Sequence, residues 1–200
     1  SILVSTTNPT KSNSGNMFAG LLANMINEGR VVTPETAQAV IPRLQALIER
    51  LGYMETSSAD IFSQFLKTGV GARPLVAGYE SQLIEFAHTN PEDYAKIKDD
   101  IVLLYPVPTV WSSHVYIALN EQGKKGLQAL MLPDIQELAW EKHGFRTGYN
   151  AANVDVSGLS VPGVAPVISR IIQMPDSQVM ESLTPAQQII KIVNEELIAT

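Results

Sequence analysis

Apolar residues along this chain follow two kinds of spacing, and each kind predicts a different element. Short apolar runs bounded by Gly, Pro, Ser or Asn are typical of strands, and they occur at residues 2–4, 74–79, 101–105 and 113–119. Longer stretches with apolar residues three and four positions apart predict helices at residues 17–26, 34–51, 57–66, 80–88, 121–130 and 133–143, a short helix after Pro91 and a last helix from Thr184. Residues 144–163 are rich in Gly, Asn and Ser, which predicts a long loop.

The helix predicted at residues 34–51 carries clear boundary signals. Thr33 suits the N-cap, Pro34 suits the first helical position, and Gly52 suits the position after the last turn. Pro42 lies inside the apolar pattern. Because proline lacks an N–H and its ring clashes with the preceding turn, we expect it to kink this helix or to delay its start.

The order of the predicted elements indicates a fold class. Up to Tyr105 strands alternate with helices, which is typical of an α/β fold with a largely parallel sheet. After Pro106 and Pro108 the predicted elements are mainly helices. We therefore expect a three-layer α/β sandwich lobe at residues 1–108, followed at residues 109–200 by a return segment and a largely helical C-terminal part.

The segment Thr7–Asn16 is the richest in candidate chemistry. It follows a predicted strand and leads into an apolar helix, so that backbone N–H groups at the helix N-terminus point outward, where the helix dipole favours an anion. Side-chain donors, and a glycine that allows close approach to the backbone, come from Thr7, Ser12, Asn13, Ser14 and Gly15. The alternative is structural: Ser12 or Ser14 is an ordinary N-cap and the rest is a solvated loop.

A second candidate lies at residues 78–81, where a predicted strand ends and a helix begins. Open α/β sheets bind ligands at such strand ends. Tyr79 could stack on a ligand and Glu80 could contact a cation or a ligand hydroxyl; alternatively, Tyr79 packs on a neighbour and Glu80 complements the helix dipole. Further along, Arg146 follows a glycine turn and is either an ion-pair partner or a carboxylate binder.

Composition disfavours several classes of protein. A formal net charge of -6 argues against a nucleic-acid or anionic-membrane surface, and no apolar run approaches the roughly 20 residues that span a bilayer. There is no cysteine, and the three histidines lack metal-site spacing, so we expect no metal and no cofactor. No nucleophile elbow, phosphate-binding loop or dinucleotide fingerprint occurs, so we expect no catalytic residues and no enzyme.

Several segments, taken in order, resemble type 2 periplasmic binding proteins, a superfamily of bacterial extracellular solute-binding proteins. Residues 5–15 are similar to the start of the second lobe of that family, and residues 75–81 to a later strand and turn. Residues 104–114 resemble the strand that crosses back to the first lobe, and residues 137–146 a late helix with its Gly-Phe-Arg turn. The resemblance covers roughly residues 1–150, while the N-terminal part of the first lobe has no counterpart in this chain.

The resemblance implies two α/β lobes around a cleft that closes on its ligand. Residues 1–108 would form one lobe, and residues 109–200 would belong to the other. Because the N-terminal part of that other lobe has no counterpart here, the cleft would be half-built. It implies a location outside the cytoplasmic membrane and a ligand contacted by Thr7, Ser12, Asn13, Ser14, Gly15 and Tyr79. The expected function is to hold a small polar or anionic solute for a membrane transporter or a sensory module. The alternative is a cell-surface interaction module that keeps the fold without a solute.

Overall fold

The chain forms two compact units that interleave along the sequence. The computed structural model describes residues 4–52, 54–68, 74–147 and 153–184. The first unit holds the described residues up to Gly78, the short segment Pro108–Trp111, and the described residues from Ile171 onward. The second unit holds the described residues of Tyr79–Val107 and Ser112–Arg170. The prediction of two lobes divided after residue 108 stays a prediction.

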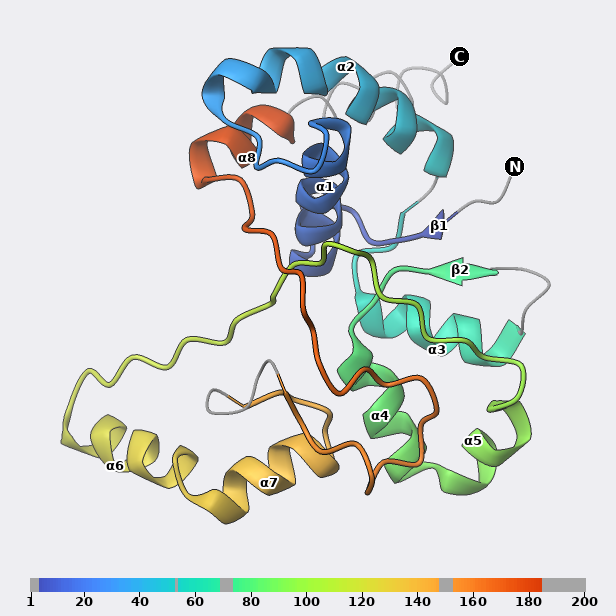
Figure 1. Ribbon diagram of the computed structural model, residues 1–200, viewed down its shortest axis with the longest axis vertical. Helices are drawn as coiled ribbons and strands as arrows, with labels where there is room; N and C mark the ends of the chain where they lie inside the picture. The colour runs from blue at the N-terminus through green and yellow to red at the C-terminus, as the bar shows by residue number, and fades with distance from the viewer. Residues whose placement is uncertain (1–3, 53, 69–73, 148–152, 185–200) are drawn as a thin grey trace, which may run out of the picture. The chain divides into compact units, whose positions relative to one another are not determined.

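The first unit combines helices with a small parallel sheet (Figure 1). Its helices are α1 (Asn13–Ile26), α2 (Pro34–Leu51), α3 (Ser58–Thr68) and α8 (Ser177–Leu183). Strand β1 (Val4–Ser5) pairs in parallel with β2 (Leu75–Val76), so that Val4 lies opposite Leu75. Strand β1 leads into the Thr7–Asn16 turn, whose last four residues form the start of α1.

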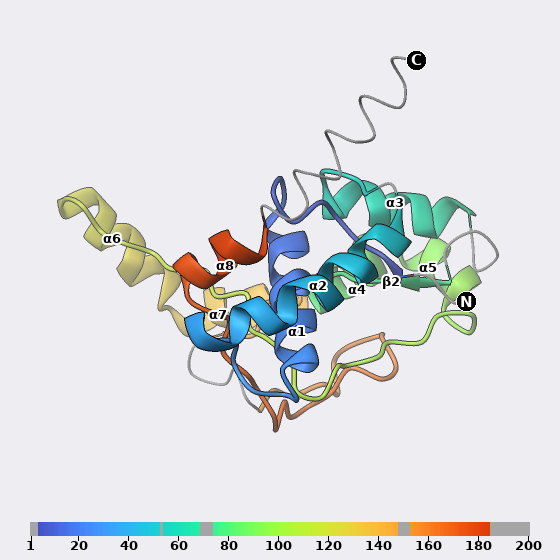
Figure 2. The ribbon, with the colours of Figure 1, turned by 90° about the horizontal axis from the view of Figure 1, so that it is seen from above.

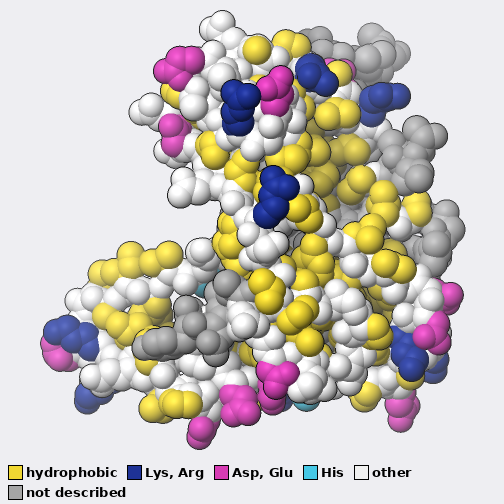
Figure 3. All heavy atoms as spheres, in the orientation of Figure 1, with side chains coloured by type: hydrophobic (Ala, Val, Ile, Leu, Met, Phe, Trp, Pro, Cys, Tyr) yellow, Lys and Arg dark blue, Asp and Glu magenta, His cyan; other side chains and the backbone are white. Residues whose placement is uncertain are grey.

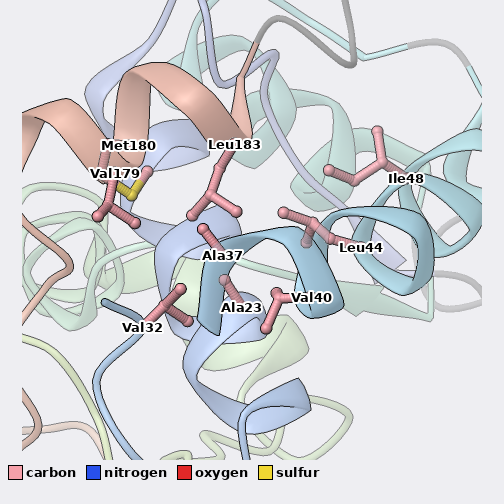
Figure 4. Packing of buried hydrophobic residues seen from close by; sticks show 9 residues of the cluster. All are labelled: Ala23, Val32, Ala37, Val40, Leu44, Ile48, Val179, Met180 and Leu183. Carbon is pink, nitrogen blue, oxygen red and sulfur yellow. The ribbon is translucent and has the colours of Figure 1, made fainter. Parts of the chain in front are cut away.

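The core of the first unit lies where α2 packs against α1 and α8 (Figures 1 and 2). Apolar side chains from the three helices and the loop before α2 point toward one another in Figure 4: Ala23, Val32, Ala37, Val40, Leu44, Ile48, Val179, Met180 and Leu183. The residues from α2 recur at spacings of three and four, which is the spacing that places side chains on one face of a helix. This face explains why the α2 pattern is readable in the sequence.

A buried amide connects α1 to the loops around this core. The side chain of Asn24 is fully buried. Its Nδ2 donates to the carbonyl of Gln173 over 2.9 Å, and its Oδ1 accepts from the N–H of Val32 over 3.0 Å. Because a buried polar group is costly unless it is hydrogen-bonded, these two bonds allow an amide to lie inside an otherwise apolar helix face.

The second unit is built from helices and irregular chain. Its helices are α4 (Glu80–Thr89), α5 (Pro91–Ile97), α6 (Glu121–Leu130) and α7 (Pro133–Glu141). In its described part, residues 144–163 form no helix and no strand, as the Gly-, Asn- and Ser-rich composition predicts. Short-range contacts connect α4 with α5 and α6 with α7.

The predicted three-layer α/β sandwich is wrong, because the described residues are mostly helical and contain only the two-stranded β1–β2 sheet. Two of the predicted strands, residues 101–105 and 113–119, have no regular structure. Their apolar alternation is typical of strands, but a strand forms only where a neighbour pairs with its backbone. Among the described residues no such neighbour pairs with them.

The helix predictions are largely confirmed, with changes at the ends. Helix α1 begins at Asn13, four residues before the apolar run, and α2 runs through Pro42 from the predicted start at Pro34. Helix α8 has no counterpart among the predictions, although Asp176 caps it by accepting from the N–H of Val179 over 2.8 Å. The helix predicted from Thr184 lies outside the described residues.

The core of the first unit gives a direct stability test on α2. Leu44 is 1% exposed and Leu47, one turn away, is 41% exposed. We expect Leu44→Ala to lower the free energy of unfolding by about 2–5 kcal/mol, because the change leaves a cavity. Leu47→Ala, as the matched control, should cost less than about 1 kcal/mol. Urea denaturation measures both, and equal losses would contradict this packing.

Candidate functional site

The Thr7–Asn16 turn brings three hydroxyl groups together. Ser14 Oγ lies 2.8 Å from Thr7 Oγ1 and 2.8 Å from Ser12 Oγ, so the three oxygens form a short hydrogen-bonded chain. Thr7 is 1% exposed, while Ser12 and Ser14 are half-buried. The chain of hydroxyls therefore leads from the interior of the first unit to its surface.

The start of α1 is not capped by a side chain. Ser12 occupies the N-cap position, but its hydroxyl makes no capping hydrogen bond and contacts Ser14 Oγ instead. The backbone N–H groups of Ser14 and Gly15, which a capping oxygen would satisfy, have no partner among the described residues. The ordinary N-cap considered for Ser12 in the sequence is thus not what its side chain does.

The direction of the protons along the hydroxyl chain follows from burial. Each hydroxyl has one proton to donate, so two hydrogen bonds among three hydroxyls leave one proton unused. An unused proton on buried Thr7 would carry the cost of an unsatisfied buried donor. Burial therefore favours donation from Thr7 to Ser14, which leaves the unused proton on one of the two half-buried serines, Ser12 or Ser14, near the uncapped N–H groups.

The turn itself is held rigidly by its own backbone and by an asparagine. Asn8 Oδ1 accepts from the N–H of Thr10 over 2.9 Å, and the N–H of Asn8 donates to the carbonyl of Glu55 over 2.8 Å. At Gly15 a Cβ would lie 2.3 Å from the carbonyl oxygen of Thr7. The absence of a side chain at Gly15 therefore makes room for the protein's own turn.

The structure places the remaining predicted site residues as follows. Asn13 is exposed at the first turn of α1, and its Nδ2 lies 3.5 Å from Met17 Sδ. Tyr79 belongs to the second unit, where it precedes α4 and its N–H donates to Gln82 Oε1 over 3.1 Å. Thr7, Ser12, Ser14 and Gly15 therefore lie together in one turn, and a shared role for Tyr79 stays a prediction.

A polar cluster in the second unit was not predicted as a group. Glu80, the first residue of α4, accepts two hydrogen bonds from Arg146: Nε to Oε1 over 2.5 Å and Nη2 to Oε2 over 3.0 Å. Glu80 Oε2 also accepts from the hydroxyl of Tyr105 over 2.5 Å. Arg146 Nη2 donates in addition to the carbonyl of Ala165 over 2.6 Å. The cluster ties four separate segments of this unit together.

Burial and the contacts within this cluster shift the pKa values of Tyr105 and Arg146. The side chain of Arg146 is 2% exposed and that of Glu80 is 16% exposed. Burial raises the pKa of Tyr105 to about 12, and the hydrogen bond to Glu80 acts in the same direction. Burial alone would lower the pKa of Arg146, but its hydrogen bond to Glu80 and the charge of that carboxylate raise it. At neutral pH Arg146 therefore keeps its positive charge and Tyr105 stays neutral.

The two remaining neighbours of Arg146 complete its surroundings. Its guanidinium carbon lies 5.3 Å from the centre of the Trp140 ring, a cation–π distance. Nη1 is buried without a hydrogen-bond partner among the described residues. Gly144, with a φ of +69°, turns the chain after α7 so closely against α4 that a Cβ would lie 2.8 Å from the Cα of Ser81. Glycine at this position brings Arg146 to Glu80.

These contacts give Glu80 and Arg146 a structural role. Of the two roles considered for Arg146, the structure shows the ion pair. For Glu80 it shows a salt bridge, which was not among the roles considered. The sequence signal that could have found the pair is weak: a buried Arg after a glycine turn needs an acidic partner, but nothing in the spacing selects a residue 66 positions away.

Comparison of the chain with protein-family models, with curated proteins and with solved structures finds no match. In the part of the chain that the structure describes, no group of three or more His, Asp or Glu side chains is arranged to hold a metal ion. The described helices include none that is both long enough and apolar enough to cross a membrane.

The Glu80–Arg146 pair predicts a large loss on truncation. Arg146→Met leaves the Glu80 carboxylate unpaired, and we expect the free energy of unfolding to fall by about 3 kcal/mol. The matched control is Lys124→Met, which breaks the exposed pair with Glu121 and should cost less than about 1 kcal/mol. Chemical denaturation compares the two, and a small loss for Arg146→Met would contradict the structural role.

Tyr105 predicts a pH dependence at the alkaline end. Its ordinary pKa is 10.0 and its folded-state pKa is about 12, so the unfolded chain releases this proton first as the pH rises. The stability that Tyr105 contributes is therefore full below pH 10 and lost between pH 10 and 12. We expect the free energy of unfolding to fall more steeply over this range in the wild type than in Tyr105→Phe. Equal slopes would contradict the raised pKa.

Proposed function

We propose that this protein binds a small polar or anionic solute at the turn before α1, as a non-enzymatic binding protein acting outside the cytoplasm. The observation that carries the proposal is the uncapped start of α1. Ser12 occupies the N-cap position without capping, and the N–H groups of Ser14 and Gly15 have no partner among the described residues. Unpaired N–H groups at a helix N-terminus, together with the helix dipole, favour a negatively charged or oxygen-rich ligand.

The hydroxyl chain supports the same ligand class. The proton that the hydroxyl chain leaves unused, on Ser12 or Ser14, is a donor, so it adds to the backbone donors and suits a ligand with acceptor oxygens. Lys11, exposed at the tip of the turn, is the nearest charge along the chain. A carboxylate, phosphate or sulfate group fits these donors, and so does a neutral ligand rich in hydroxyls.

The downstream role follows from the same class of ligand. A protein that binds a solute without converting it serves by delivering it or by reporting its concentration. We propose a membrane transporter or a sensory module as the partner, and a periplasmic or cell-surface location in a bacterium. The order of segments similar to type 2 periplasmic binding proteins supports this role, although the three-layer lobe of that family does not form here.

One observation favours a second candidate, a cell-surface interaction module. Large apolar side chains are exposed along residues 113–119 and on α6, among them Ile117 at 72% and Leu119 at 89%. Monomeric proteins seldom leave such side chains together at the surface, and a protein partner is the usual reason for them. Binding of a solute at the Ser12 turn would not be needed for this function.

Ligand binding at the turn is tested by thermal unfolding with a panel of phosphate, sulfate, amino acids and sugars. A ligand at 100 times its Kd stabilises the folded state by about 2.7 kcal/mol, and so raises the Tm. Ser12→Ala and Ser14→Ala should weaken binding by about tenfold or more, because each removes a donor or disrupts the hydroxyl chain. Ser63→Ala, a half-buried serine of α3 in the same unit, is the matched control.

Two results would contradict the proposal. One is the absence of any Tm shift across the panel, which would favour the interaction module. The other is a shift that survives both serine substitutions unchanged, which would place the ligand elsewhere on the chain.

A further inference from the structure

Residues 113–119 form an extended segment that leads into α6 (Figure 1). Their backbone N–H and C=O groups make no hydrogen bond to any other described part of the backbone. Backbone groups of an extended chain normally pair with a neighbouring strand. This extended segment therefore has two backbone edges with which no described strand pairs.

One side of the segment is already packed within the second unit. The His114 ring meets the Phe145 ring edge to face, with 5.5 Å between centroids. The hydroxyl of Tyr116 donates to the carbonyl of Gly123 in α6 over 3.1 Å. A Cβ on Gly123 would lie only 3.2 Å from the Cα of Ala118. Tyr116 and Ala118 thus contact α6, and His114 contacts Phe145 in the loop after α7.

The odd-numbered side chains point away from that contact. Val115 is 79% exposed, Ile117 72% and Leu119 89%. Tyr116, between Val115 and Ile117, is less exposed at 46%, so the exposed fraction varies with the two-residue period of a β-strand. The exposed side is apolar, and hydrophobic side chains cover much of the α6 region in the lower left of Figure 3.

Nothing in the segment blocks pairing with another chain. Proteins usually protect exposed strand edges with charged side chains, prolines or bulges. Between Asp100 and Glu121 the sequence has no Asp, Glu, Lys or Arg, and residues 113–119 contain no proline. An occupant of the open edge meets no charge there, so a segment that is itself uncharged and strand-forming fits it.

We propose that the occupant is a second copy of the same segment, paired antiparallel about a two-fold axis at Ile117. In that register Val115 lies opposite Leu119 and Ile117 lies opposite its own copy, so the exposed side forms apolar cross-strand pairs. On the packed side the large Tyr116 lies opposite the small Ala118. No like charges face each other across the axis, and such self-complementary contacts are the rule in two-fold dimers. This self-association is independent of the proposed solute site.

Sedimentation equilibrium over a range of protein concentrations tests the proposal. We expect a reversible change from 21.8 kDa to twice that mass. Ile117→Lys places two charges opposite each other at the axis and should weaken the dimer by about tenfold or more. The matched control is Val102→Lys, an equally exposed apolar residue of the same unit, which should leave the dimer intact. A monomer at all concentrations, or equal effects of the two lysines, would overturn the proposal.

A cysteine scan tests the register and does not depend on how the lysine variants fold. The natural chain has no cysteine, so each introduced thiol is the sole one. The Cα atoms of residues directly opposite in an antiparallel pair lie about 4.5–5.5 Å apart, within the range of Cα separations that a disulfide bridges. Ile117→Cys should therefore form a disulfide-linked dimer under mild oxidation several times faster than Val102→Cys. Equal rates for the two variants would contradict pairing at Ile117.

Discussion

Every backbone N–H and C=O group that leaves water needs a hydrogen-bond partner, and this requirement decides the architecture of the chain. A helix meets it within one segment, so α1 to α8 form wherever the apolar spacing and the end signals permit. A strand depends on a neighbour. Val4–Ser5 and Leu75–Val76 find each other, whereas residues 101–105 and 113–119 have no partner strand among the described residues. The fold is therefore helical, with one small sheet and two extended segments.

The same requirement distinguishes the two polar clusters. In the second unit most polar atoms of the Glu80, Tyr105 and Arg146 side chains have hydrogen-bond partners within the cluster or on the backbone. These bonds connect four segments of the chain. In the first unit the hydroxyls of Thr7, Ser12 and Ser14 satisfy one another while leaving the start of α1 uncapped. A network whose donors and acceptors are paired within the protein stabilises the fold, whereas a network with unpaired donors can bind a ligand. This contrast is the reason why we propose the solute site at the start of α1.

The sequence predicts the parts of this structure that depend on local spacing. The α2 boundaries follow from Thr33, Pro34 and Gly52, and its buried face follows from helical periodicity. Pairing between distant segments is not predictable in this way, because alternating apolar residues at 113–119 show strand character but not the presence of a neighbour. For the same reason the sequence does not predict the Glu80–Arg146 pair or the contacts within the hydroxyl chain, although it identifies Thr7, Ser12 and Ser14 as donors.

The claim that residues 113–119 are a strand without its neighbour is tested most directly by amide hydrogen exchange. If a second copy supplies the neighbour, the amides of this segment should become protected as the protein concentration rises, while those of α6 keep a constant rate. Protection that is absent at every concentration would contradict the account. So would protection that is already complete in dilute monomer, because it would mean that the segment has a partner within its own chain.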